Sequence, residues 1–185
     1  MKTQLISRMV CITLFLGMLS LNQAHAVGNV SLLYGNKKLD DIAWQPVENQ
    51  QEFGLMLDFQ ISDLPVNIAI DYLKSDDTGV LEGATYKGET DELHLGLRQY
   101  INEGETLVPY IGGGVAFIEG EYSGNGRFDT DVDAGFWVGV GLNWMLGQHF
   151  HVGIDMRLSS ADLTLYERQV DGGGAHYAIT TGISF

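Results

Sequence analysis

Hydrophobic and polar side chains alternate along most of the chain, which is the pattern of strands with one apolar face. The last eleven residues show it most clearly. One face of an extended strand there carries Ala175, Tyr177, Ile179, Thr181, Ile183 and Phe185. The other face carries small or polar residues, namely His176, Ala178, Thr180, Gly182 and Ser184. The pattern predicts a strand that runs to Phe185.

Seven earlier segments have the same period, at residues 28–35, 51–60, 65–74, 89–100, 108–119, 133–144 and 149–159. The facing of 108–119 is ambiguous, because this segment is apolar on both sides. Long links at 36–50, 75–88, 120–132 and 160–173 alternate with short ones at 61–64, 101–106 and 146–147. This arrangement predicts an all-β protein, an eight-stranded antiparallel up-and-down transmembrane β-barrel with short periplasmic turns and long external loops. Both termini then lie in the periplasm.

Aromatic residues occur near both ends of the predicted strands, as expected for rings at two membrane interfaces. Those near the short turns are Phe59, Tyr100, Tyr110, Trp144, Phe150 and Phe185. Those near the long links are Tyr34, Phe53, Tyr72, Phe117, Phe136 and Tyr177. A soluble lipocalin-like barrel is the alternative, but it would need a charged outer face. The alternate face here is rich in Gly and Ala, which suit a crowded interior.

The first 26 residues predict a signal peptide. Lys2 and Arg8 form a basic start, residues 9–21 are apolar, and Ala24-His25-Ala26 fits a signal-peptidase site. The mature chain would begin at Val27 and form one barrel domain over 27–185. The only cysteine, Cys11, lies within this segment. The mature chain therefore has no disulfide, thiolate nucleophile or cysteine-ligated metal.

Acidic residues dominate the charge. The sequence has 24 Asp and Glu against 10 Lys and Arg, and two of those basic residues belong to the predicted signal peptide. The mature chain then has eight basic residues and a net charge of −16, which argues against nucleic-acid partners and against a basic lipid-binding surface. After Ala26, no stretch approaches the ~20 apolar residues that a membrane helix needs.

Several charged residues fall on the inward face of the predicted strands. An eight-stranded barrel has room inside only for side chains, and an unpaired buried charge is costly. We therefore predict a plugged lumen with a charge network of Glu52, Asp58, Asp71, Glu92, Arg98, Asp155 and Arg157. Asp133, His94, His151 and His176 share that face. Because acids outnumber bases, some carboxylates are expected to be protonated, hydrated, near a mouth or bound to a cation.

Metal binding is expected only weakly, and no cofactor is expected. The three inward histidines are predicted to lie too far apart along the barrel axis to share a metal. Asp129, Asp131 and Asp133 form a possible weak divalent-cation site in the third external loop, although a solvated loop edge is the alternative. Beside an anionic lipopolysaccharide leaflet, Ca²⁺ or Mg²⁺ is expected to stabilise these acidic loops.

The segment Pro109-Tyr110-Ile111-Gly112-Gly113-Gly114-Val115-Ala116-Phe117 resembles the fifth strand of small outer-membrane barrels of the OmpA, OmpX and OmpW type. The final strand, with Tyr177, Ile183 and Phe185, resembles the closing strand that the barrel-assembly machinery reads in that family. The resemblance implies a monomer in the bacterial outer membrane, in contact with lipid and lipopolysaccharide. It also implies a non-enzymatic structural or surface-interaction role, with an OmpW-like conduit for small apolar solutes as the alternative.

A second resemblance points to an enzyme. Lipid A deacylases of the PagL type carry a His-x-Ser pair late in the chain, followed by an acidic residue, which is the logic of an activated serine. Here Arg157-Leu158-Ser159 stands in that place, followed by Glu167. Arginine cannot act as the base at neutral pH. We therefore expect no enzymatic activity.

Overall fold

The computed structural model describes residues 28–40, 42–60 and 64–185. The barrel strands are β1 (Gly28–Lys38), β2 (Asn49–Gln60), β3 (Asn67–Leu81), β4 (Ala84–Tyr100), β5 (Leu107–Gly124), β6 (Arg127–Leu146), β7 (Phe150–Ser160) and β10 (Gly174–Ser184). A separate two-stranded sheet consists of β8 (Asp162–Leu165) and β9 (Arg168–Asp171). The predicted signal peptide and the start at Val27 lie outside the described residues. Within the described ranges, no helix is long and apolar enough to cross a membrane.

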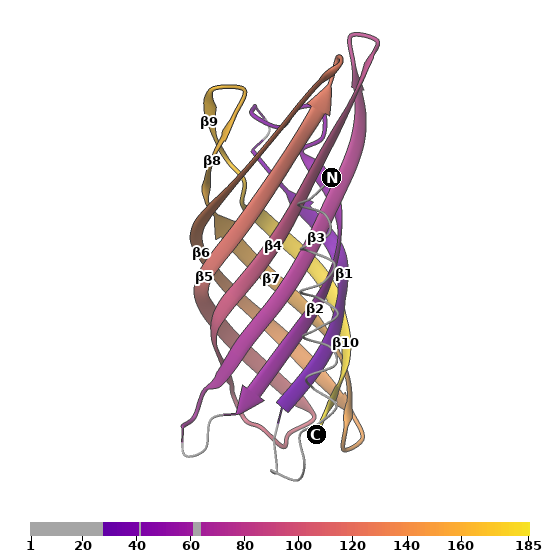
Figure 1. The fold of residues 1–185 in the computed structure, drawn as a ribbon. Coiled ribbons are helices and arrows are strands. Elements are labelled where there is room, and N and C mark those ends of the chain that lie inside the picture. The colour runs from indigo at the N-terminus through magenta and orange to yellow at the C-terminus, as the bar shows by residue number, and fades with distance from the viewer. Residues whose placement is uncertain (1–27, 41, 61–63) are drawn as a thin grey trace, which may run out of the picture.

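The strands close into an antiparallel barrel in the order β1-β10-β7-β6-β5-β4-β3-β2 (Figure 1). Among the barrel strands in the described ranges, only β1 and β10 pair across a long stretch of sequence, and their register runs from Asn29 opposite Ser184 to Lys38 opposite Ala175. Closure leaves neither terminal strand with an unpaired edge. The predicted fold class, an eight-stranded up-and-down barrel, is confirmed for the described residues.

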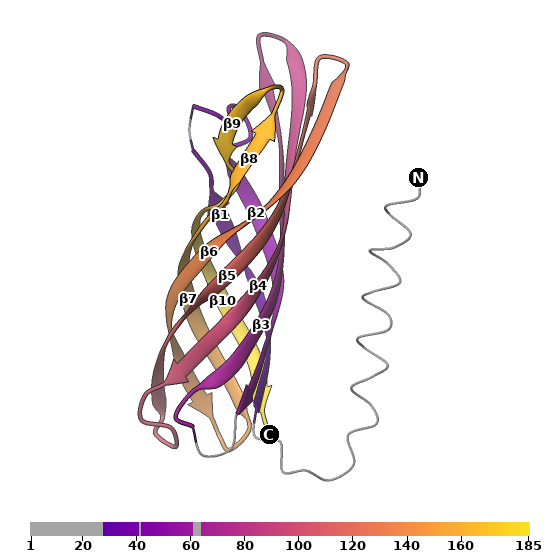
Figure 2. The ribbon, with the colours of Figure 1, turned by 60° about the vertical axis from the view of Figure 1, so that its left-hand side comes forward.

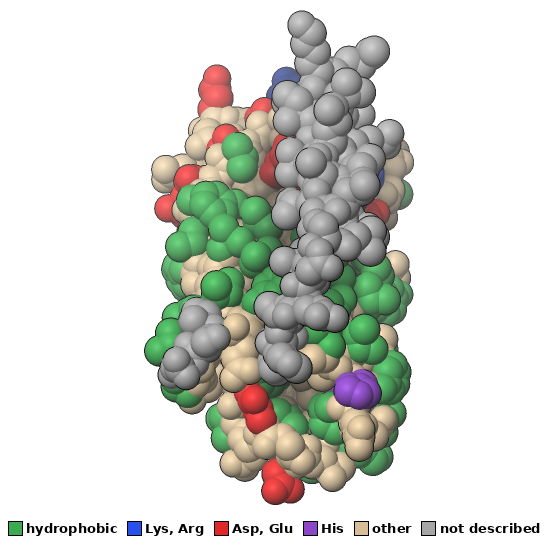
Figure 3. Space-filling model, turned by 60° about the horizontal axis from the view of Figure 1, so that its bottom comes forward, with side chains coloured by type: hydrophobic (Ala, Val, Ile, Leu, Met, Phe, Trp, Pro, Cys, Tyr) green, Lys and Arg blue, Asp and Glu red, His purple; other side chains and the backbone are tan. Residues whose placement is uncertain are grey.

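The alternation of side chains separates an apolar outside from a filled inside. On β6, Phe136 and Val138 point outward and are exposed, whereas Trp137 between them is buried. Many hydrophobic side chains are accordingly exposed on the outside of the barrel, and Figure 3 shows them gathered on the face in view. The ambiguous strand β5 is also resolved, because Ala116 and Ile118 are buried and Val115 is exposed.

Two aromatic residues lie inside the barrel and not in the predicted girdle near the short turns. Tyr110 is 4% exposed, and its hydroxyl donates to Asp155 Oδ2 at 2.6 Å. Tyr100 is partly buried and its hydroxyl donates to Asp58 Oδ2 at 2.6 Å. The girdle prediction is wrong for these two residues, because each phenol has a carboxylate partner in the interior that lipid would not offer.

Two of the predicted long loops are strands instead. β3 and β4 continue to a two-residue turn at Glu82-Gly83, and β5 and β6 continue to one at Asn125-Gly126. Positive φ angles at all four positions, 52° and 81° in the first turn and 52° and 75° in the second, fit the type I′ turns that match strand twist. Long hairpins therefore project from one end of the barrel (Figure 2).

We call this end, which also carries β8, β9 and the β1–β2 link, the hairpin end. We call the opposite end, where the shorter links lie, the turn end. The predicted link at 61–64 belongs to the turn end, but 61–63 lie outside the described residues.

An apolar cluster fills the barrel interior at the hairpin end. Its members come from the β1–β2 link and from β8, namely Leu39, Trp44, Val47, Leu163 and Leu165. Trp44 is 1% exposed, and its indole Nε1 donates to the backbone oxygen of Asp171 at 2.8 Å. We call this cluster the apolar cap. It ties the β1–β2 link to the β8–β9 hairpin.

Candidate functional site

The middle of the barrel interior contains a network of paired charges. Arg98 donates from Nη1 to Asp58 Oδ1 and from Nη2 to Asp71 Oδ2, both at 2.6 Å. Arg157 donates from Nη1 to the same Asp71 Oδ2 at 3.0 Å and from Nε to Asp155 Oδ1 at 2.7 Å. These residues come from β2, β3, β4 and β7, so the network crosses the lumen from wall to wall.

Trp137 completes this central layer. The guanidinium carbons of Arg98 and Arg157 lie 5.7 and 5.6 Å from its ring centroid, within cation–π range. The ring also stacks on His94, with centroids 5.4 Å apart and an interplanar angle of 9°. A water-filled channel would expose the side chains that line it. The two arginines and Trp137 are at most 3% exposed, so the described side chains close the lumen here.

A second cluster lies nearer the hairpin end and centres on Lys37, which is fully buried. Its ammonium nitrogen donates to Glu92 Oε1 at 2.5 Å, to Thr90 Oγ1 at 2.9 Å and to the backbone oxygen of Gly172 at 2.7 Å. Glu92 Oε2 also contacts His94 Nε2 at 2.8 Å. Lys37 is absent from the predicted charge network because the predicted first strand ends at Gly35, whereas β1 continues to Lys38.

The prediction that the inward histidines lie far apart is wrong for one pair. The ring centroids of His94 and His176 are 6.3 Å apart, because β4 and β10 face each other across a narrow lumen. His151 lies elsewhere, with Nε2 at 2.9 Å from Ser31 Oγ. Position along the barrel axis alone, without the cross-lumen contacts, could not reveal the close pair.

Three buried residues offer a geometry that could hold a metal ion. Glu52, Glu92 and His176 each present one ligand atom, and these atoms lie within 4.8 Å of one another. The Lys37 ammonium already lies against Glu92 and supplies a positive charge to this cluster. A divalent cation would have to displace it. The lysine accounts for the clustering of carboxylates without a metal, so we interpret the group as a charge cluster.

Ser159 takes part in a serine–histidine–glutamate relay that the sequence did not reveal. Its Oγ lies 2.9 Å from His176 Nε2, and His176 Nδ1 lies 2.6 Å from Glu52 Oε1. A histidine protonated on Nδ1 would donate to Glu52 and accept the hydroxyl proton of Ser159, which is the arrangement of an activated serine. The predicted obstacle, Arg157 in place of a base, is bypassed because the histidine comes from a different strand. Ser159 is nevertheless buried, and it lines neither of the cavities at the two barrel ends.

The three aspartates of the predicted cation site have backbone donors close by. Asp129 Oδ2 accepts from the amide of Tyr166, and Asp131 Oδ2 accepts from the amide of Thr164, both at 2.6 Å. Asp133 is exposed, and its Oδ1 accepts from the amide of Ala134 at 2.7 Å. The first two carboxylates thus hold β8 and its turn against β6, and the divalent-cation site stays a prediction.

The residues of the predicted assembly signal lie on the outer surface. Tyr177, Ile183 and Phe185 are exposed on the lipid-facing side of the last strand. The backbones of Gly28 and Phe185 exchange hydrogen bonds of 2.9 and 3.0 Å, which closes the barrel at the turn end.

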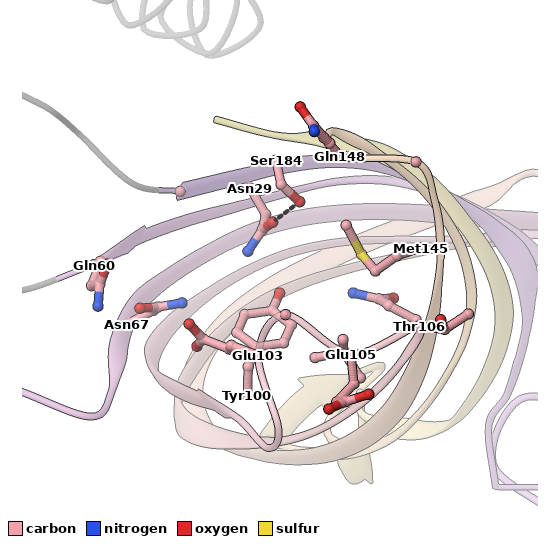
Figure 4. A pocket seen from close by; sticks show the side chains of 15 residues that line it. Asn29, Gln60, Asn67, Tyr100, Glu103, Glu105, Thr106, Met145, Gln148 and Ser184 are labelled. Carbon is pink, nitrogen blue, oxygen red and sulfur yellow. Dashed lines mark hydrogen bonds between the residues drawn. The ribbon is translucent and has the colours of Figure 1, made fainter.

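A polar vestibule of about 590 Å³ opens at the turn end (Figure 4). Asn29, Asn67, Tyr100 and Asn143 line it, with Glu103 and Glu105 on the β4–β5 link. Ser184 Oγ donates to Asn29 Oδ1 at 2.6 Å on its rim. Because Tyr100 binds Asp58 of the central network, the vestibule ends at that network.

A closed barrel with an apolar outside and a lumen of paired charges defines the class of membrane-spanning barrels. Comparison with protein families matches residues 11–184 to the outer membrane protein beta-barrel domain. The chain belongs to this family, whose members are proteins of the bacterial outer membrane. Comparison with curated proteins returns no match.

Solved structures of small outer-membrane barrels share the fold. The chain is similar to Neisserial surface protein A, with 8% identity, coverage of 88% of this chain and 98% of that one, and a TM-score of 0.63. It is similar to Ail of Yersinia pestis, with 13% identity, coverage of 88% and 100%, and a TM-score of 0.63. For OprG of Pseudomonas aeruginosa the identity is 17%, the coverage 86% and 94%, and the TM-score 0.56. At these identities, the likeness concerns the fold alone.

Proposed function

We propose that the protein is a closed, non-enzymatic outer-membrane barrel that acts as a surface-interaction or structural protein through its hairpin end. The observation that supports this most is the filled lumen, in which buried arginines and Trp137 meet from opposite walls. With the lumen closed, the ordered hairpins are the part of the molecule that a partner outside the cell can reach.

The proposal includes an orientation. The hairpin end faces the cell exterior, beside lipopolysaccharide, and both ends of the mature chain face the periplasm. Long external segments and short periplasmic turns are the arrangement of outer-membrane barrels. We further propose that the protein is a monomer, inserted by the barrel-assembly machinery, and that it binds no nucleic acid.

The Ail structure supports a surface role in general terms. Ail was solved in complex with the heparin analogue sucrose octasulfate, so one barrel of this fold binds a small anionic ligand.

The alternative role, a conduit for small apolar solutes, requires a path through the barrel wall or lumen. The buried central network argues against the lumen path.

A second candidate function, hydrolysis by an activated serine, is favoured by the relay of Ser159, His176 and Glu52. A fluorophosphonate probe tests it. In that reaction the Ser159 Oγ–phosphorus bond would form, fluoride would leave and His176 would take the hydroxyl proton. The burial of Ser159 predicts no labelling. Labelling of the native protein that disappears in Ser159→Ala and His176→Gln would establish an activated serine and favour the enzyme.

The main test compares cells that express the protein with cells that lack it, in surface retention and in solute uptake. We expect expression to change the retention of cells on immobilised host glycans or proteins, without changing the uptake of small apolar solutes. Faster uptake with unchanged retention would overturn the surface role in favour of the conduit.

A further inference from the structure

A cleft lined by tyrosines opens between the projecting hairpins at the hairpin end. It has a volume of about 850 Å³ and lies between the β4–β5–β6 extensions and the β8–β9 hairpin. The residues that matter for its chemistry are Tyr86, Tyr122, Tyr166, Arg127, Arg168 and Gln169. We call it the tyrosine cleft. It is separate from the buried charge network and from the vestibule at the turn end.

The aromatic wall of the cleft is preformed. The ring centroids of Tyr86 and Tyr122 are 5.9 Å apart, and those of Tyr122 and Tyr166 are 6.1 Å apart. The Tyr122 hydroxyl donates to the backbone oxygen of Gln45 at 2.8 Å, and the Tyr166 hydroxyl donates to the backbone oxygen of Tyr122 at 3.2 Å. Trp44 of the apolar cap supports Tyr122 from behind, at 6.0 Å. A ligand would therefore meet ordered rings and would not need to order them.

The charge of the cleft is opposite to that of the protein. Its only charged lining residues are Arg127 and Arg168, in a chain with 24 acidic and 10 basic residues. Both arginines are exposed, and among the described residues neither forms an ion pair. One oxygen of Asp129 accepts the Tyr166 amide, and Asp129 does not line the cleft. Two guanidinium groups with free donors thus flank an aromatic wall.

We propose that the tyrosine cleft binds an anionic oligosaccharide that carries sulfate, phosphate or carboxylate groups. This proposal rests on the surface role proposed above and names the ligand class. The C–H face of a sugar ring packs on an aromatic face, and an arginine fork pairs with oxyanions through two parallel hydrogen bonds. A long polyanion such as nucleic acid would be repelled by the acidic surface around the cleft. A short saccharide can place its anionic groups on the two arginines alone.

Calorimetry on the mature protein in nanodiscs of zwitterionic lipid tests the proposal. The probe is a size-defined, sulfated heparin hexasaccharide, and its desulfated form is the chemical control. We expect binding of the sulfated form that weakens as salt rises. The double variant Arg127→Gln/Arg168→Gln should weaken it at least tenfold. Tyr86→Leu should weaken it several-fold through loss of a ring face.

Lys87→Gln is the matched control. It also removes one positive charge from an exposed site on a hairpin, but Lys87 pairs with Glu89 and does not line the cleft. It should change the affinity less than twofold. Circular dichroism of each variant checks that the barrel is intact.

Each further result of the binding experiment supports or overturns the proposed saccharide site. A phosphorylated lipopolysaccharide core oligosaccharide that binds in place of heparin, with the same arginine dependence, supports the site and assigns the ligand to the cell's own surface. No binding of either saccharide, or binding unchanged in the double variant, overturns the proposal. An acidic peptide that binds as well as the saccharides overturns the saccharide class. Cell retention that persists in the double variant would leave the surface role standing.

Discussion

The two ends of the barrel differ in what they expose. The turn end opens into a polar vestibule that stops at the Asp58–Arg98 pair. The hairpin end is filled by the apolar cap and extends beyond it as ordered strands with an aromatic, basic cleft. The vestibule resembles the unfilled mouth of a plugged barrel, whereas the hairpins are held together by contacts of their own, such as those of Asp129 and Asp131 with backbone amides of β8 and its turn. This difference is the basis for the proposal that recognition occurs at the hairpin end, whereas the middle of the barrel is closed.

The largest expected effect comes from breaking the closed middle. Asp71→Ala would leave Arg98 and Arg157 without their shared carboxylate and should destabilise the fold by about 3 to 5 kcal/mol. Urea unfolding in lipid vesicles measures the difference. Asp133→Ala is the control, because Asp133 is exposed and its removal should cost less than about 0.5 kcal/mol. Equal costs would show that the central network does not hold the barrel.

Arginine substitutions at two outward-facing positions of β6 show where the lipid-covered part of the barrel ends. Val138 and Val132 both point outward and are 49% and 63% exposed, but Val132 lies on the projecting hairpin. Val138→Arg should cost about 2 to 4 kcal/mol near mid-membrane, whereas Val132→Arg should cost about 0 to 1 kcal/mol. Refolding into vesicles measures both. Similar costs at the two positions would contradict the assignment of the hairpin to the aqueous side.

The β8–β9 hairpin should loosen when its carboxylate anchors are removed. Asp131→Ala leaves the Thr164 amide without its charged acceptor and should cost about 1.5 to 3 kcal/mol of local stability. Trypsin cleavage after Arg168 reports the opening, and Glu119→Ala, at an exposed position on β5 outside the predicted cation site, serves as the control. The same digestion, repeated after a chelator has removed divalent cations, tests the predicted divalent-cation site. Faster cleavage of the native protein after chelation supports a bridging cation, and an unchanged rate indicates that the backbone amides suffice.

The smallest expected effect is a pH dependence of the β3–β4 hairpin. Burial opposes ionisation of Glu89, but hydrogen bonds from Lys74 and Lys87 outweigh it and hold the pKa of this carboxyl below its usual value. A lowered pKa stabilises the fold above the unfolded value of about 4.3, and the contribution is lost as pH falls through the folded pKa.

Hydrogen exchange of the hairpin amides should therefore rise slightly between pH 5 and pH 3. The stabilisation involved is below about 1 kcal/mol, because the pairs are partly exposed. Glu89→Gln should abolish the pH dependence, and Glu82→Gln at the turn should not. An unchanged profile in Glu89→Gln would exclude this carboxyl as its source.

Sequence alternation was sufficient to predict the membrane-embedded half of the fold. Lipid imposes an apolar residue at every second position, so Val138 and Trp137 could be assigned to opposite faces in advance. Beyond the lipid, both faces of a strand meet water, so no apolar residue is required at every second position and the pattern weakens. The hairpins were therefore predicted as loops, although Asn125-Gly126 is a strong local turn signal.

Cross-lumen contacts could not be predicted for a different reason. Ser159 meets His176, and His94 approaches His176, only because the barrel closes with a particular register. A single sequence shows which residues point inward but not which of them meet. Tyr110 was misassigned on similar grounds, since an aromatic ring suits both an interface and a partnered site inside.

Ion conductance across a planar lipid bilayer tests the closed barrel most directly. Purified mature protein should give no stepwise current at neutral pH, because the central arginines and Trp137 are at most 3% exposed. A large porin, measured in a separate bilayer, is the positive control. Reproducible current steps from the native protein, lost on its removal, would contradict the closed lumen and favour the conduit.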